Sequence, residues 1–239
     1  MGFHSTHLDD LDFNPSDHVD FLRGENFRQL SQEFRVLSPS GGKIEYMLGV
    51  SYLRNSWHSL EHLYWNTPGF PPRTPIAGQL YNGPFVNDFS EDTTSKSLFA
   101  NGLWRAAEAL RVSVALRYTD EGKQVRYGRT NSAPFTLWNV KINPPFPITP
   151  LVFDGSFLDG NFALEHYVGT DTSVYLSYGR SNKLVGFVET NGVPSANPAV
   201  DARIESETTS SVELGIKLHA FSKRLALNLA MFDMEIANF

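Results

Sequence analysis

The chain has 239 residues, a formal net charge of −6 and no cysteine. This modest acidity argues against a nucleic-acid-binding protein, which needs a basic face. The lack of cysteine excludes disulfide frameworks, thiolate metal sites and cysteine nucleophiles. No stretch approaches the roughly 18 consecutive apolar residues of a membrane-spanning helix, which excludes a helical membrane protein.

Apolar and polar residues alternate with a period of two along much of the chain, which is typical of β-strands with one apolar face. In residues 110–119, Leu110, Val112 and Val114 share one face, while Arg111 and Ser113 lie on the other. The pattern predicts eight strands, in chain order over residues 30–36, 44–52, 97–104, 110–119, 162–168, 173–179, 211–218 and 225–236.

The connections between these strands are alternately short and long. Short turns are predicted at residues 38–43, 105–109, 169–172 and 221–224. The long segments 55–94, 120–161 and 181–209 hold most of the prolines and are predicted as loops. This arrangement places every long loop at the same end of the sheet, as in outer-membrane barrels with short periplasmic turns and long extracellular loops.

The predicted fold class is therefore an all-β, antiparallel up-and-down transmembrane β-barrel. A soluble β-sandwich fits the alternation equally well, because its strands also have one buried face. The loop asymmetry favours the barrel, since compact soluble domains rarely carry loops longer than about 15 residues. Aromatic residues near strand ends suit the interfacial girdles of such a barrel: Tyr46, Tyr52, Trp104, Tyr118 and Tyr178.

Several strings in the predicted strands and turns carry a family resemblance. They are residues 31–39 (SQEFRVLSP), 41–46 (GGKIEY), 116–123 (LRYTDEGK), 175–180 (YLSYGR), 212–217 (VELGIK) and 225–232 (LALNLAMF). In this order and spacing they resemble successive hairpins of the β-barrel of TonB-dependent outer-membrane receptors. The chain departs from the family at Asn182, near which an aromatic residue is usual.

The resemblance implies that residues 26–239 form about eight strands of a larger barrel, preceded by a loop segment over residues 1–25. Transporters of this class have about 22 strands and a plugged lumen. The plug domain, the TonB-contacting segment and a signal peptide are all expected to be absent from this sequence. The implied location is the outer membrane of a Gram-negative bacterium, with outer-membrane lipid as a partner.

The implied function is part of an active transporter that takes up a ferric siderophore or a similar scarce nutrient. The TonB complex would drive it through the missing plug. We expect no enzymatic activity, no cofactor, no bound metal and no nucleic-acid partner. The alternatives are a small closed eight-stranded outer-membrane barrel and a soluble carbohydrate-binding β-sandwich.

Candidate ligand-binding residues are concentrated in the first long segment. Aromatic side chains there could grip a bulky ligand, or could simply pack the segment against its neighbours. The candidates are Trp57, His58, Trp65, Tyr81 and Phe85.

Two motifs suggest metal chemistry and are set aside. Residues 58–62 (HSLEH) fit the inverted zincin pattern, which needs a helix, whereas we expect a loop there. Residues 154–161 (DGSFLDGN) have oxygen ligands at calcium-like spacing but lack the closing glutamate, so a polar loop is expected.

Overall fold

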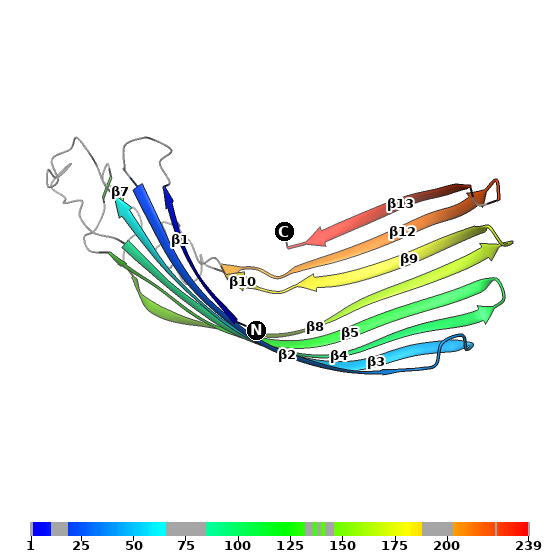
Figure 1. Ribbon diagram of the computed structural model, residues 1–239, viewed down its shortest axis with the longest axis horizontal. Helices are drawn as coiled ribbons and strands as arrows, with labels where there is room; N and C mark the ends of the chain where they lie inside the picture. Colours follow the sequence, from blue (N-terminus) through cyan, green and yellow to red (C-terminus); the bar gives the residue numbers. More distant parts are fainter. Residues whose placement is uncertain are drawn as a thin grey trace.

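The computed structural model describes residues 2–10, 19–65, 85–131, 136–137, 140–141, 146–187, 203–222 and 224–238. Its main element is a curved antiparallel sheet of nine strands that follow one another in chain order (Figure 1). These strands are β1 (Gly2–Asp10), β2 (Val19–Leu37), β3 (Ile44–Trp65), β4 (Phe85–Ala107), β5 (Leu110–Asn131), β8 (Phe146–Val168), β9 (Thr172–Lys183), β12 (Glu207–Ala220) and β13 (Leu225–Ala237).

Two small two-stranded sheets accompany the main sheet. One pairs β6 (Thr136–Leu137) with β7 (Val140–Lys141), and the other pairs β10 (Gly186–Phe187) with β11 (Arg203–Ile204). Within the described ranges, no helix is long and apolar enough to cross a membrane.

Short turns join β2 to β3, β4 to β5, β8 to β9 and β12 to β13, all at the right-hand end of the sheet in Figure 1. In the first turn, the backbone N–H of Ser38 donates to the carbonyl of Tyr46 (2.9 Å), and the Ser38 hydroxyl accepts from the Tyr46 N–H (2.9 Å). Gly41 and Gly169 have φ angles of +85° and +71°, which favour glycine. The eight predicted strands and the four predicted turns are confirmed.

One face of the sheet, which we call the outer face, carries a continuous band of apolar side chains. Directly opposed residues of neighbouring strands lie on the same face. The rows of this apolar belt across β3, β4, β5 and β8 are Ile44–Trp104–Val112–Leu164, Tyr46–Gly102–Val114–Phe162, Leu48–Ala100–Leu116–Gly160 and Val50–Leu98–Tyr118–Leu158. Leu98 is 61% exposed and Leu158 55% exposed, so the belt needs a nonpolar environment outside the chain.

The opposite, inner face is polar at the same level. Ser51, Ser97 and Thr119 follow one another across β3, β4 and β5, and Arg117 lies opposite Asp159 across β5 and β8. An apolar outer face and a polar inner face are the pattern of a membrane barrel wall. Among the described residues no second layer packs on the belt, so the sandwich alternative is not supported.

The predicted long loops are wrong over much of their length, because the strands continue far beyond the belt. β3 has 22 residues and β4 has 23, whereas about 10 residues cross a membrane. The outer face changes character at the row Tyr52–Lys96–Asp120–Ser156, which follows directly on the belt. From there the outer face carries mainly polar residues, while the inner face carries both polar residues and the apolar side chains of Trp57, Phe89 and Val125, so the alternation of the belt disappears from the sequence.

The expected loop over residues 1–25 is also wrong. β1 occupies Gly2–Asp10 and pairs antiparallel with the first half of β2. Its sequence includes glycine, histidine, threonine and aspartate and shows no clear strand pattern. The segment is a strand because its backbone pairs with β2.

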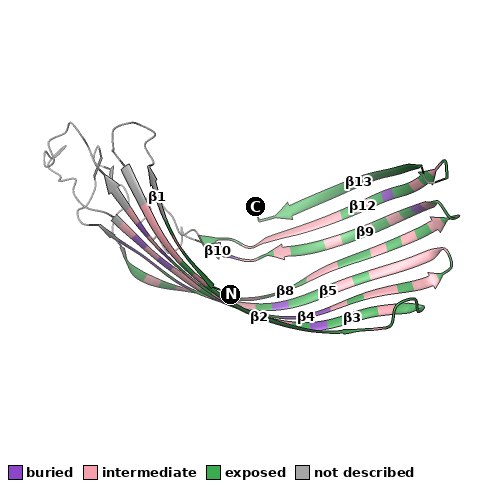
Figure 2. Cartoon of the chain, in the orientation of Figure 1, coloured by how far each residue is buried: buried purple, intermediate pink, exposed green. Residues whose placement is uncertain are grey.

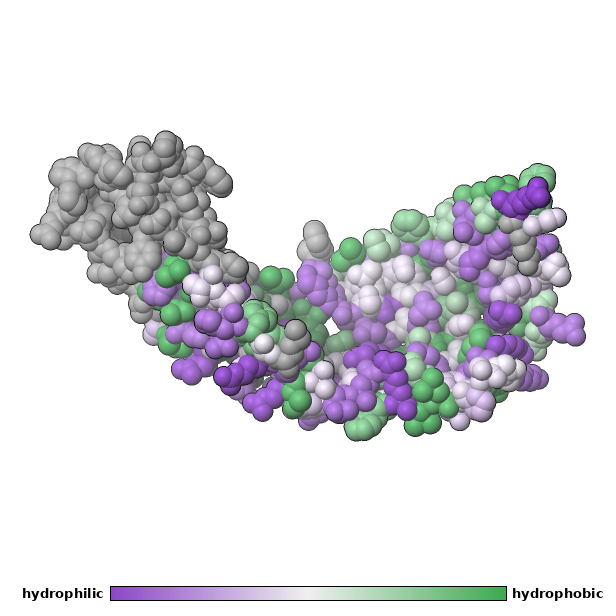
Figure 3. Space-filling model, viewed as in Figure 1, coloured by the Kyte–Doolittle hydropathy of each residue, from purple (hydrophilic) through white to green (hydrophobic). Residues whose placement is uncertain are grey.

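The described sheet is open rather than closed. β1 and β13 form its two edges, and β13 is exposed along its whole length (Figure 2). Hydrophobic side chains gather along this edge, at the upper right of the space-filling view (Figure 3). An unpaired edge is not tolerated in hydrocarbon, so the sheet is a partial barrel and not the small closed barrel considered above.

Position 49, on the inner face of β3, has room only for glycine, because the ring of Phe99 on β4 lies against it. A Cβ at this position would overlap the ring of Phe99 and lie 3.0 Å from the carbonyl oxygen of Phe34. We expect Gly49→Val to lower the free energy of unfolding by roughly 1–3 kcal/mol through overpacking.

Urea titration of the intact protein measures this effect, with Gly102→Val as the matched control. Nothing lies within 4 Å of a Cβ added to Gly102. Equal losses in the two variants would show that the Phe99 ring does not rest on Gly49.

Candidate functional site

An aromatic cluster lies on the inner face between the belt and the loop ends of the strands. It is formed by Phe89, Val125 and Tyr127, with Trp57 packed against it. The ring centroids of Trp57 and Phe89 are 5.3 Å apart, and those of Phe89 and Tyr127 are 6.0 Å apart, both edge to face. Successive inner-face positions of β3, β4 and β5 thus build one rigid apolar wall.

A segment distant from these strands also contacts the cluster. Phe187 of β10 packs against it, together with Leu151 of β8. Because β10 follows β9, the chain beyond β9 returns over the inner face toward β4 and β5. Figure 1 shows β10 within the concave side of the sheet.

A row of polar side chains, buried except for the half-buried Arg23, borders the cluster on its loop side. Arg23, Glu61, Asn87 and Arg129 lie directly opposite one another across β2, β3, β4 and β5. Arg129 Nε donates to Asn87 Oδ1 (2.7 Å), and Asn87 Nδ2 donates to Glu61 Oε2 (3.1 Å). Arg23 Nη1 lies 3.6 Å from Glu61 Oε1. We call these four residues the buried charge row.

Burial dominates the electrostatics of this row. Glu61 is 2% exposed, and this desolvation raises the pKa of its carboxyl, against the lowering effects of Asn87 and the two arginines. Burial likewise raises the pKa of Tyr127, whose hydroxyl accepts from Arg129 Nη2 at 3.1 Å. The row is a structural network that holds four strands in register beside the aromatic cluster.

The raised pKa of Glu61 predicts a pH-dependent stability. The protonated form contributes stability that is fully present below the ordinary pKa of 4.5 and is lost as the pH rises through the raised value. The side chain introduced by Glu61→Gln stays neutral at every pH. We therefore expect the wild type to lose stability relative to this variant as the pH rises from about 4 to about 8. Urea titrations across this range measure the difference, and a pH-independent difference would contradict the assignment.

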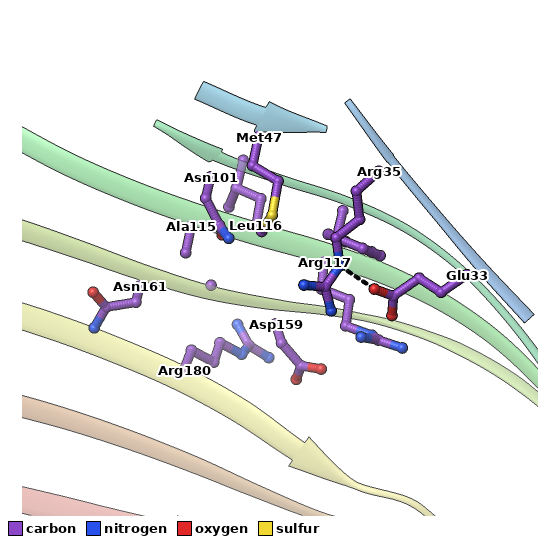
Figure 4. A pocket seen from close by; sticks show the side chains of 12 residues that line it. Glu33, Arg35, Met47, Asn101, Ala115, Leu116, Arg117, Asp159, Asn161 and Arg180 are labelled. Carbon is purple, nitrogen blue, oxygen red and sulfur yellow. Dashed lines mark hydrogen bonds and ion pairs between the residues drawn. The ribbon is translucent and has the colours of Figure 1, made fainter. Parts of the chain in front are cut away.

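A second feature, nearer the middle of the sheet, is a hollow of about 380 Å³ on the inner face (Figure 4). Its lining includes Arg35 and Arg117, together with Glu33 and Asp159. Arg180 also borders the hollow, although the strand register places it opposite Gly160 of the belt. Arg117 donates to the hydroxyls of Ser97 (2.9 Å) and Ser51 (3.1 Å), and Arg35 pairs with Glu33. The hollow therefore presents two guanidinium groups fixed by their neighbours, those of Arg35 and Arg117, which suit anionic oxygen ligands or carboxylates.

The structure separates the predicted site residues. Trp57 lies on the inner face in the aromatic cluster, whereas His58 lies on the outer face, where its Nε2 is 2.9 Å from Asp88 Oδ1. Trp65 ends β3 and Phe85 begins β4, while Tyr81 lies outside the described residues. The local sequence provided no signal for Phe89, Tyr127 and Arg129. Strands over 85–107 and 110–131, paired in the observed register, place these residues on the face of Trp57.

Neither metal motif has the structure expected of it. Residues 58–62 and 154–161 both lie in strands, β3 and β8, and not in loops. A strand turns Glu61 to the face opposite His58 and His62, so the three cannot share a metal. In the described part of the chain, no group of three or more potential metal ligands occurs.

Comparison with known proteins assigns the family. Residues 3–239 match the family described as TonB dependent receptor-like, beta-barrel. Among curated proteins, no significant sequence relative was found.

Solved structures agree with this fold. The ferric yersiniabactin uptake receptor FyuA of Yersinia pestis is similar with a TM-score of 0.69 and 12% identity, over 93% of this chain and 30% of that one. The siderophore receptor PiuA of Acinetobacter baumannii is similar with a TM-score of 0.55 and 15% identity, over 90% of this chain and 31% of that one. The alcaligin outer-membrane receptor FauA of Bordetella pertussis is similar with a TM-score of 0.52 and 14% identity, over 92% of this chain and 30% of that one.

The chain thus spans less than a third of the length of these receptors. At these identities the likeness establishes the fold. Together with the family match over nearly the whole sequence, it explains the open sheet, the apolar belt and the polar inner face. The chain belongs to the TonB-dependent receptor family and forms part of its β-barrel.

Proposed function

We propose that this chain is part of the wall of an outer-membrane active transporter that takes up a ferric siderophore or a similar scarce nutrient. The family consists of outer-membrane receptors of Gram-negative bacteria, and not of enzymes. The three similar structures are named as receptors for ferric yersiniabactin, a siderophore and alcaligin. In this proposal the TonB complex drives transport through a plug in the longer receptor.

The observation that carries the proposal is the opposite character of the two faces at one level. Leu98, Tyr118 and Leu158 lie exposed on the outer face, while Arg117 and its serine partners lie on the inner face. Such a wall separates lipid from an aqueous lumen in a large barrel. The inner arginines add fixed positive charge along the path of an anionic chelate.

Iron uptake tests this proposal. The full-length receptor is expressed in a strain that lacks its own siderophore receptors, and uptake of radioactive iron from a panel of ferric siderophores is measured with and without TonB. We expect uptake of at least one chelate, lost when TonB is deleted. Uptake that persists without TonB, or none across the panel, would contradict the proposal.

Trp57 is the predicted ligand-binding residue that the inner face best supports. Its ring borders the lumen side of the wall, and aromatic faces bind bulky ligands through stacking and burial. We expect Trp57→Ala to raise the chelate concentration for half-maximal uptake by roughly tenfold, equivalent to about 1.4 kcal/mol. Trp65, Tyr81 and Phe85 stay predictions for the same ligand.

His58→Ala is the matched control, since this neighbour lies on the outer face. Heat-modifiable migration on a denaturing gel checks that both variants fold. Equal effects of the two substitutions on uptake would remove Trp57 from the ligand site.

A further inference from the structure

Two further aromatic residues, on β1 and β2, lie on the inner face beside the aromatic cluster. The rings of Phe3 and Phe27 stack, with their centroids 5.3 Å apart and their planes inclined by 27°. Phe27 lies directly opposite Trp57 of β3, so all three residues share the inner face. The aromatic surface thus continues across β2 to β1, and we call Phe3, Phe27 and Trp57 the aromatic strip.

The aromatic strip is open, whereas the cluster beside it is closed. Phe89 is 1% exposed and Tyr127 is 5% exposed, but Phe3 is 49% exposed, and Phe27 and Trp57 are half-buried. Within the described part of the chain, the opposed residues Phe27 and Trp57 make no ring contact with each other. Phe27 instead stacks on Phe3, and Trp57 packs on Phe89. The strip therefore keeps ring surface that the described residues leave uncovered.

The charged side chains next to the aromatic strip are paired with one another. On β2, Arg23 Nη2 donates to Glu25 Oε1 at 2.6 Å. Glu91 lies opposite Trp57, and its Oε1 is 3.5 Å from Lys123 Nζ. Because these charges are neutralised within the chain, the strip selects a ligand by ring contact more than by net charge.

A polar atom without a partner lies next to Trp57 on the same face of β3. Asn55, two residues before Trp57, has a buried Oδ1 that accepts no hydrogen bond from any described residue. A buried acceptor without a donor costs free energy, which a donor carried by a ligand recovers. The residue as a whole is half-buried, so a rotation of its amide brings this oxygen to the surface. Such a site suits a planar ring with an N–H donor at its edge.

We propose that the aromatic strip binds an aryl ring of a ferric chelate, and that an N–H group next to this ring donates to Asn55 Oδ1. The ring contacts Phe27 and Trp57, where it adds to the existing series of aromatic pairs. A chelate built from aliphatic groups alone has no ring for these surfaces. This inference rests on the proposed uptake function and narrows its substrate to aryl chelates.

Equilibrium binding of radioactive iron complexes to the full-length receptor, purified in mild detergent, tests this site. The probes are the ferric complexes of benzohydroxamate, acetohydroxamate and N-methylbenzohydroxamate. The first two share the iron-binding group and differ in the ring, whereas the third keeps the ring and lacks the N–H donor. We expect the wild type to bind the benzohydroxamate complex at least about tenfold more tightly than the acetohydroxamate complex.

Substitutions in the site should change these preferences separately. Phe27→Ala should lower the preference for the ring to about threefold or less, and Phe27→Tyr, which keeps a ring, should restore most of it. N-methylation should weaken binding to the wild type by about threefold or more and should have no effect in Asn55→Ala. Heat-modifiable migration checks that each variant folds.

Asn26→Ala is the matched control, because Asn26 precedes Phe27 in β2 and lies on the outer face, opposite His58. It should keep the preferences of the wild type. Equal binding of the benzohydroxamate and acetohydroxamate complexes to the wild type would overturn the proposal, and so would equal binding with and without the N–H donor. TonB-dependent uptake is measured separately. A receptor that takes up only ring-free chelates would keep the transport proposal and refute this one.

Discussion

Substitution of Arg129 by alanine is expected to destabilise the protein by about 3–5 kcal/mol, the cost of removing one partner from a buried ionic network. Arg129 is 3% exposed and donates to Asn87 and to the Tyr127 hydroxyl. Among the described residues, Glu61 then keeps Arg23, at 3.6 Å, as its nearby cation, and Asn87 loses the Arg129 donor to its amide oxygen. The buried carboxylate then lacks half of its compensation.

This loss is measured as the unfolding free energy of the full-length receptor, reconstituted in lipid vesicles and titrated with urea. Arg126→Ala is the matched control, since Arg126 lies three residues away on the outer face of the same strand and is exposed. Its effect should stay within about 0.5 kcal/mol. Similar losses in both variants would show that the buried charge row does not stabilise the sheet.

An arginine placed in the apolar belt should have an effect of similar size. Val114 lies on the outer face of β5, between the rows of Val112 and Leu116. We expect Val114→Arg to cost about 2–4 kcal/mol, because the guanidinium would enter hydrocarbon. The inner-face neighbour Ala115 lines a hollow that already holds arginines, so Ala115→Arg should cost less than about 1 kcal/mol.

The same urea titration compares the two variants at adjacent positions of one strand. Both variants introduce the same side chain at adjacent positions of one strand, so the comparison reports which face each residue occupies. A larger loss for Ala115→Arg than for Val114→Arg would reverse the assignment of the two faces.

The strand segments inside the belt were predictable because lipid and water impose opposite demands on alternate residues. Val112, Val114 and Leu116 alternate with Ser113 and Ala115, and this period of two is visible in the sequence alone. Beyond Tyr52 and Tyr118 both faces meet polar surroundings. The hydropathy of β3 and β5 then loses its alternation, although the backbone pairing continues unchanged.

The candidate site was less predictable, because it depends on which face each residue takes and on cross-strand register. Trp57 and His58 are adjacent in sequence, yet a strand sends them to opposite faces. Glu61 and Arg129 are 68 positions apart, and only the pairing of β3, β4 and β5 brings them into one row. Local composition contains no signal for such a row, whereas a correct strand register would have revealed it.

We infer that the sheet separates lipid on its outer face from water on its inner face. This chain has no native cysteine, so single cysteines introduced along residues 112–118 meet no competing thiol within it. The full-length receptor, with any cysteine elsewhere replaced by serine, is spin-labelled at these positions in lipid vesicles. Collision rates with oxygen, which dissolves in lipid, and with a water-soluble nickel chelate then report the surroundings of each label. We predict that positions 112, 114, 116 and 118 favour oxygen and that positions 113, 115 and 117 favour the nickel chelate. Labels without this alternation, or with the opposite one, would contradict a membrane-barrel wall.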